Sequence, residues 1–193
     1  MKNTAHTILL VGKPGSGKGT QAKILSEKMG WIRLSSGDRI KQIRDGNEPF
    51  SPRVKESYDK GILMPDWFAD YLLESALLGV EPHVGIVCEG FGRTLSQAEH
   101  FHDIASWLGR KVLVINLEVS DEEVLRRMLL RAQEQSRPDS NSAEKIKARL
   151  DQYNALTVPA IEFFRKENLL VDVDGSMTPE EIAEEIKKVV KGL

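Results

Sequence analysis

Four short runs of apolar residues recur along the chain, separated by much longer and more polar segments. The first is Thr7-Ile8-Leu9-Leu10-Val11, and the others lie at 86–88, 112–117 and 169–171. A continuous apolar run of this length is typical of a strand that is buried on both faces. Because the segments between the runs have helical periodicity, the order predicts βα units around a parallel sheet, which is an α/β fold.

Two of the predicted helices carry a start signal. Ser120 with Glu123, and Thr178 with Glu181, fit the capping box, in which the first side chain and the fourth satisfy each other's backbone N–H groups. Apolar residues on one face of the last helix would then pack on the sheet; they are Ile182, Ile186, Val189 and Leu193.

Composition removes several classes of protein. With 40% hydrophobic and 29% charged residues, the 193-residue chain has the make-up of a globular domain, and no apolar stretch approaches the roughly 20 residues that cross a bilayer. The net charge of -2 argues against a nucleic-acid-binding surface. The single cysteine, Cys88, excludes an internal disulfide, and residues 1–5 lack signal-peptide organisation. We therefore expect a cytoplasmic protein with no membrane or nucleic-acid partner, and as a separate expectation we take it to be a monomer.

A glycine-rich segment follows the first strand directly and leads into a helical pattern. It reads Gly-Lys-Pro-Gly-Ser-Gly-Lys-Gly-Thr over residues 12–20. Glycines allow the backbone N–H groups to wrap an anion, while the helix N-terminus and Lys18 add positive charge. The strict P-loop pattern has Ser or Thr immediately after the lysine, whereas here Gly19 intervenes before Thr20. The segment predicts a phosphate-binding loop of a variant form.

Residues 12–21 resemble the phosphate loop of adenylate kinases, and three later segments agree with that family in order and spacing. They read SSGDRIK at 35–41, GILMPD at 61–66 and EGFGRTLSQA at 89–98, where the family has STGDMLR, GxLVPD and DGFPRTxxQA. The resemblance implies a P-loop NTPase fold whose five-stranded parallel sheet is flanked by helices, with the second strand ending before residue 35. It also implies a core of 1–34, 65–131 and 143–193, a helical NMP-binding flap at 35–64 and a short lid at 132–142.

The same resemblance implies reversible transfer of the ATP γ-phosphoryl group to AMP, giving two ADP, with Mg²⁺ as cofactor. Two alternatives stay open at this point: a kinase for UMP or CMP or of relaxed acceptor specificity, and a nucleotide-binding homologue of low activity. Ser36, Thr94 and Gln97 favour AMP, because UMP and CMP kinases tend to carry Ala and Asn at the first two positions. The family's long lid, which sometimes binds zinc, is absent, so no zinc is expected.

Site residues carry over from the family motif by motif. The residues implied to bind ATP are Gly15, Ser16, Gly17, Lys18, Gly19, Thr20, Arg127 and Met177. Those implied to bind AMP are Ser36, Lys41, Ile62, Leu63, Met64, Gly90, Phe91, Gly92, Arg93, Gln97, Arg137 and Arg149. The implied catalytic set is Lys18, Arg93, Arg131, Arg137 and Arg149, with Mg²⁺ held by Thr20 and, through water, by Glu89.

One of these residues has a second interpretation, and four depart from the family pattern. Thr94 to Gln97 is also a capping box, so Gln97 either contacts adenine or caps a helix. The departures replace an arginine, a threonine, a proline and an aspartate of the family; they are Lys41, Ser36, Gly92 and Glu89. None of them removes a catalytic charge, although lysine lacks the two-pronged grip of arginine on a phosphate.

Overall fold

The apolar runs form the strands of a single parallel sheet in the computed structural model, which describes residues 6–135 and 142–191. The strands are β1 (His6–Gly12), β2 (Ile32–Ser35), β3 (Ile86–Glu89), β4 (Lys111–Glu118) and β5 (Leu170–Asp174). They lie in the order β2-β3-β1-β4-β5 and all pair in parallel. The predicted five-stranded α/β fold is therefore confirmed.

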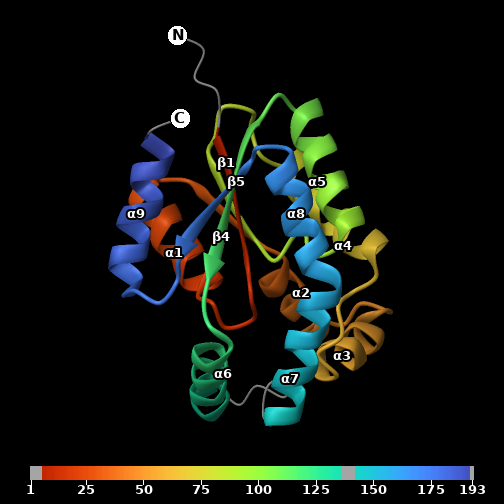
Figure 1. Ribbon diagram of the computed structural model, residues 1–193. Helices are drawn as coiled ribbons and strands as arrows, with labels where there is room; N and C mark the ends of the chain where they lie inside the picture. The colour runs from red at the N-terminus through yellow and green to blue at the C-terminus, as the bar shows by residue number, and fades with distance from the viewer. Residues whose placement is uncertain (1–5, 136–141, 192–193) are drawn as a thin grey trace.

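Helices connect the strands and cover both faces of the sheet. Up to β4 they are α1 (Lys18–Met29), α2 (Ser36–Asp45), α3 (Ser51–Asp59), α4 (Asp66–Leu78) and α5 (Leu95–Trp107). After β4 come α6 (Asp121–Gln135), α7 (Ala143–Gln152), α8 (Val158–Lys166) and α9 (Pro179–Lys191), with a five-residue π-helix, η2 (Tyr153–Thr157), between α7 and α8. Figure 1 shows α1 and α9 on one side of the sheet and α4, α5 and α8 on the other.

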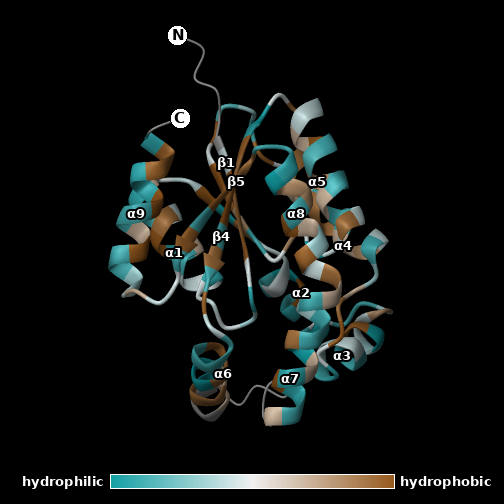
Figure 2. Ribbon diagram, viewed as in Figure 1, coloured by the Kyte–Doolittle hydropathy of each residue, from teal (hydrophilic) through white to brown (hydrophobic). Residues whose placement is uncertain are grey.

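Alternate side chains of the central strand β1 pack into two separate hydrophobic cores, one on each face of the sheet. Leu9 of β1 packs with Phe101 of α5 and Phe164 of α8, whereas Leu10 packs with Leu25 of α1 on the opposite face. All five side chains are at most 1% exposed. Burial on both faces explains why β1 is a continuous apolar run, and Figure 2 shows the strands as mainly hydrophobic between helices with hydrophilic outer faces.

The remaining helices lie beyond the carboxyl ends of the strands. Figure 1 places α6 and α7 below the end of β4. Helices α2 and α3 lie toward the same end of the molecule. A small third cluster of Val119, Val124, Met128 and Ile146 packs α6 against α7. In open parallel sheets this edge is where ligands bind, so the helices are suited to enclosing a site there.

Helix ends agree closely with the sequence signals. The N–H of Glu181 donates to Thr178 Oγ1 and the N–H of Thr178 donates to Glu181 Oε2, which completes the capping box of α9. At α6 only one arm forms: Ser120 Oγ accepts from the N–H of Glu123, but the Glu123 carboxylate binds arginines instead. Within the described residues, the helices are too short or too polar to cross a membrane.

Candidate active site

The glycine-rich segment turns from β1 into α1 at one end of a large cleft. Gly17, with φ +99°, immediately precedes Lys18, the first residue of α1. Such a φ favours glycine, so the local backbone explains why that residue type stands here. The cleft has a volume of about 850 Å³ and is lined by the segment from Pro14 to Gln21 among others. It is large enough for a nucleotide-sized ligand.

Lys18 is folded back onto its own loop. Its ammonium donates to the carbonyl oxygens of Gly12 at 2.8 Å and Lys13 at 2.6 Å, and lies 3.4 Å from Ser16 Oγ. Desolvation by burial lowers the pKa of Lys18 from its ordinary value of 10.5 to about 7, with Arg93 as the second cause. A cation that is poorly solvated and surrounded by other cations is a strong anion-binding group.

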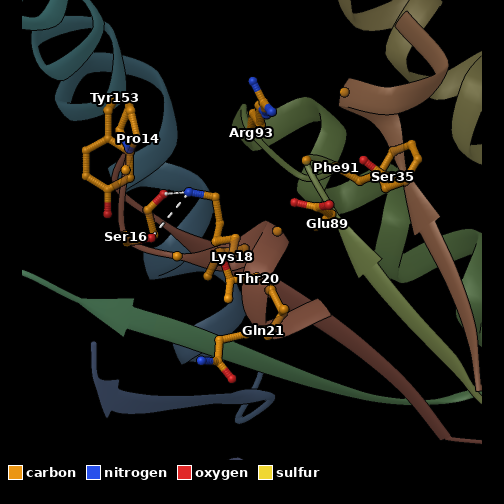
Figure 3. Close-up of a pocket in the computed structure, with 18 of the residues that line it drawn as sticks. Pro14, Ser16, Lys18, Thr20, Gln21, Ser35, Glu89, Phe91, Arg93 and Tyr153 are labelled. Carbon is orange, nitrogen blue, oxygen red and sulfur yellow. Dashed lines mark hydrogen bonds between the residues drawn. The ribbon is translucent and has the colours of Figure 1, made fainter. Parts of the chain in front are cut away.

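Three arginines from different parts of the chain line the same cleft. Arg93 follows β3, Arg131 lies on α6 and Arg149 on α7, and the positive charge of each lowers the pKa of Lys18. Figure 3 shows Arg93 across the pocket from Lys18, whose ammonium lies toward Ser16. The structure thus brings together the predicted basic residues that it describes; Arg137 lies outside the described residues, as do residues 136–141 of the predicted lid.

One end of the cleft contains Arg127 and Met177. Arg127 is held by two partners, because its Nε donates to Glu123 Oε1 at 2.6 Å and its Nη1 donates to the carbonyl oxygen of Gly175 at 3.0 Å. Both Arg127 and Met177 line the cleft, next to Pro179 and Ile182 at the start of α9. A fixed guanidinium plane beside a flexible thioether offers a surface on which a planar base can stack.

The opposite end of the cleft is made by α2, α3 and the segment after them. Lys41, Tyr58 and Ile62 to Met64 all line it. Ser36 is only 3% exposed and donates from Oγ to the carbonyl oxygen of Gly90 at 2.8 Å, so its hydroxyl joins α2 to the loop after β3. Gly90 has φ +83°, and a Cβ there would collide with the Ser36 hydroxyl. Gly90, Phe91 and Gly92 also line the cleft.

Gln97 is engaged by protein groups on both sides of its amide. Its Oε1 accepts from the N–H of Arg93 at 3.1 Å, and its Nε2 donates to Asp66 Oδ1 at 2.8 Å. Its own N–H donates to Thr94 Oγ1 at 3.2 Å, which caps α5. Gln97 is 3% exposed, and its side-chain amide joins the backbone of Arg93 to Asp66 at the start of α4, whereas the group that caps α5 is the Thr94 hydroxyl. The contact between Gln97 and adenine stays a prediction.

Glu89 ends β3 with its carboxylate beside the phosphate loop. A Cβ on Gly19 would lie 3.1 Å from Glu89 Oε2, so the carboxylate lies directly against the backbone of the phosphate loop. Thr20 is exposed in the same cleft. A hydroxyl and a carboxylate supply the oxygen atoms that Mg²⁺ prefers, so the residues present fit that ion. Figure 3 shows the Glu89 carboxylate at the end of β3, facing the start of α1 where Lys18 and Thr20 lie.

A residue that motif comparison did not single out, Arg33, completes this part of the site. It lies on β2, lines the cleft and forms ion pairs with Asp38 and Glu89. The parallel register pairs Ser35 with Glu89, and Arg33 precedes Ser35 by two residues on the same face. In the sequence, the feature that could have indicated Arg33 as a site residue is its position two residues before the end of the strand.

The comparisons with known proteins agree with this geometry. A family model described as adenylate kinase matches residues 10–169. An adenylate kinase from Maricaulis maris is 37% identical over 177 residues, covering 91% of this chain and 94% of the relative. Adenylate kinases from Thermus thermophilus and Elusimicrobium minutum are 35% and 34% identical, covering 96% and 95% of this chain and 97% of each relative. Since these matches extend over nearly the whole of both proteins, the chain belongs to the adenylate kinase family.

Proposed function

We propose that the chain catalyses phosphoryl transfer from ATP to AMP, with the two nucleotides lying head to head in the cleft. ATP would extend from Arg127 and Met177 to the phosphate loop, and AMP would occupy the end that contains Lys41. The observation that carries this proposal is the convergence of Lys18 with Arg93, Arg131 and Arg149 on one cleft. The meeting point of two phosphate groups is where so many cations are needed.

The reaction needs charge stabilisation more than proton transfer. The phosphate of AMP is already an anion, so one of its oxygens attacks the γ-phosphorus of ATP without a general base. The bond from that phosphorus to the bridging oxygen of the β-phosphate breaks, and two ADP result. Arginines that face the transferred group stabilise the charge on its equatorial oxygens, a contribution on the order of 10³-fold in rate for one such residue.

Lys18 would exchange its loop contacts for phosphate oxygens. In the structure its ammonium is held by the carbonyls of Gly12 and Lys13, which keeps it at the phosphate loop. A phosphate group accepts the same hydrogen bonds and adds full negative charge, so it competes well for the ammonium. The loop N–H groups from Gly15 to Thr20 would complete the cradle.

Mg²⁺ would be held at Thr20, with Glu89 binding one of its water molecules. When bound, it supplies positive charge that neutralises the β- and γ-phosphate oxygens. The protein's own contribution is to keep the Thr20 hydroxyl in the cleft and the Glu89 carboxylate next to Gly19. Glutamate reaches one methylene further than the aspartate of the family.

Acceptor specificity would come from the shape of the AMP end. Ser36 and Gln97 are buried in hydrogen bonds with Gly90, Asp66 and the backbone of Arg93, so they fix the wall against which a base lies. Backbone groups of residues 62–64 would hold the ribose and base. We also infer a monomer, and a cytoplasmic location, for which a buried free thiol such as Cys88 is ordinary.

A coupled assay of ADP formation with AMP, CMP, UMP and GMP as acceptors tests the proposal. AMP should give the highest kcat/KM, and Lys18→Met should abolish transfer without unfolding the chain. Arg93→Ala should raise the KM for AMP far more than that for ATP, because Arg93 would grip the AMP phosphate. A matched control is Arg165→Ala, which removes an exposed arginine paired with Glu162 and Asp172.

Each other outcome has a definite meaning. Equal turnover of CMP or UMP would replace the proposal with a kinase of relaxed acceptor specificity. Near-normal turnover by Lys18→Met would overturn the assigned site. Tight nucleotide binding without transfer to any acceptor would favour the low-activity homologue.

A further inference from the structure

Arg33 connects two carboxylates on the floor of the cleft. Its Nη1 lies 2.9 Å from Asp38 Oδ2, and its Nη2 forms an ion pair with Glu89 Oε1. Among the described residues its Nε has no hydrogen-bond partner, although it is buried. The guanidinium is therefore oriented by these two carboxylates, one at the start of α2 and one at the end of β3.

The ion pairs continue in both directions as a row of alternating charges. Lys41 Nζ lies 3.6 Å from Asp38 Oδ1, and Asp38 and Glu89 flank Arg33. Glu89 in turn acts on Lys18, whose pKa its negative charge raises. All five groups line the same cleft. Arg33 is the central cation of this row, between the AMP end and the phosphate loop.

Among the described residues, Glu89 forms an ion pair with Arg33, while its negative charge also acts on Lys18. Its carboxylate binds Arg33 on one side and lies against Gly19 of the phosphate loop on the other. Lys18 donates instead to Gly12, Lys13 and Ser16. A carboxylate next to an ammonium in a partly desolvated cleft pairs with it strongly unless another cation holds it.

We propose that Arg33 is a positioning residue for ATP binding: it holds the Glu89 carboxylate away from Lys18, so that the Lys18 ammonium stays available to the phosphates of ATP. The inference rests on the proposed role of Lys18 as the phosphate-binding lysine. Without the guanidinium, Glu89 turns to Lys18, and ATP has to break that ion pair before it binds. The fork of arginine suits this task, because it grips two carboxylates at once.

A double-mutant cycle on the full chain separates this role from a structural one. Calorimetry in the presence of EDTA measures the dissociation constant of ATP for the unmodified chain, Arg33→Gln, Glu89→Gln and the double variant. Arg33→Gln should weaken binding by about tenfold, because ATP then has to break one partly desolvated ion pair first. In the Glu89→Gln background the same substitution should change binding by less than about twofold, because no carboxylate remains to capture Lys18.

Arg33→Lys is the matched control for charge. It keeps the cation but loses the fork, so it should restore most of the affinity that Arg33→Gln loses. If Arg33→Gln does not fold, Arg33→Lys takes its place in the cycle, with a smaller loss that again disappears in the Glu89→Gln background. Thermal unfolding of every variant shows whether the fold is retained.

Two results would overturn the inference: no loss of ATP affinity in Arg33→Gln, or an equal loss with and without Glu89. The second would mean that Arg33 attracts ATP by its own charge. Lys18→Met in the same assay distinguishes failure of the proposed function, since unchanged ATP binding by that variant would remove the role of Lys18 itself. If Lys18→Met loses binding while the cycle shows no coupling, only the inference about Arg33 fails.

Discussion

Gly92 has a backbone conformation and surroundings that restrict which residue can stand next to Arg93. Its φ is +63°, which proline, fixed near -65°, does not adopt, so the proline found here in the family would need a different backbone. A Cβ at this position would lie 3.3 Å from Leu9 Cδ2 and 3.3 Å from Phe164 Cε2. Gly92 is therefore constrained twice, by its backbone conformation and by the core below it.

Gly92→Ala should destabilise the chain more than Gly109→Ala. Both glycines have nearly the same φ, +63° and +65°, but a Cβ on Gly109 meets nothing within 4 Å. Each substitution should lower the free energy of unfolding by about 1 kcal/mol, because alanine disfavours the left-handed backbone. Gly92→Ala should lower it by about 1–3 kcal/mol more, because its methyl group crowds the core. Urea unfolding measures both changes. Equal losses would show that the core yields to the added methyl group.

Lys18 gives stability a specific pH dependence. Its folded-state pKa of about 7 is below the ordinary 10.5, because burial disfavours the ammonium. Between these values the unfolded chain binds more protons than the folded chain, so the contribution of Lys18 to stability rises with pH across that window. Below it, the full penalty of the buried charge is present.

Lys18→Met should remove this rise. The stability of the variant minus that of the unmodified chain should be greatest near pH 7. This difference should decrease toward about pH 10, because the stability of the unmodified chain rises over that range. Urea unfolding at a series of pH values measures the difference. Lys147→Met, at an exposed position on α7, serves as the control. Parallel curves for Lys18→Met would contradict the lowered pKa.

At the scale of elements, η2 joins the helix that carries Arg149 to the loop that carries Arg93. Thr157, its last residue, is 8% exposed and donates from Oγ1 to the carbonyl oxygen of Arg93 at 2.9 Å. Arg149 precedes η2 on α7. π-Helical turns are frequent at functional sites, and this one holds the backbone of Arg93 through the Thr157 hydroxyl.

Thr157→Val should lower stability by about 1–2 kcal/mol and raise the KM for AMP more than the KM for ATP, because it leaves the Arg93 carbonyl without its buried donor. Thr7→Val is the matched control: Thr7 is fully buried, and within the described residues its Oγ1 has no hydrogen-bond partner. That substitution should be neutral or stabilising. Urea unfolding and steady-state kinetics measure the pair. A similar response of both would show that the Arg93 contact contributes nothing.

The elements differ in how well the sequence predicts them. β1 is a clear apolar run because both its faces are buried, whereas β2 reads Ile-Arg-Leu-Ser, since it lies at the edge of the sheet and turns Arg33 toward the cleft. Family resemblance, not periodicity, located that strand. The capping box at Thr178 was fully readable because its two partners are three residues apart. The π-helix was not, because no local residue pattern specifies its extra backbone residue.

Within the site, local motifs were readable and long-range partners were not. The phosphate loop can be predicted from nine consecutive residues, 12–20, because strand, turn and helix are contiguous there. The ion pairs of Arg33 join residues that are 5 and 56 positions away, and only the register of β2 on β3 brings the second pair together. Likewise, Gln97 satisfied two sequence patterns at once, and its contact with Asp66 appears only in three dimensions.

At the scale of the molecule, the parallel sheet gathers the two ends of the cleft at one edge. The phosphate loop follows β1, Arg93 follows β3 and Met177 follows β5, all at the carboxyl ends of strands. The site is therefore one space with two ends, and not two separate pockets. A ligand that spans both ends gains from the contacts of each while losing its freedom once.

A compound of two adenosines joined by a chain of phosphates should consequently raise the melting temperature far more than ATP or AMP at the same concentration. Arg127→Ala should reduce the shift with ATP but not with AMP, Lys41→Ala should do the reverse, and both should reduce the shift with the joined compound. Thermal unfolding with each ligand measures these shifts, and a compound with only two bridging phosphates, too short to span the cleft, is the control. If the long compound stabilises the chain no more than ATP does, or if its effect is insensitive to Lys41→Ala, then the two nucleotides do not share this cleft.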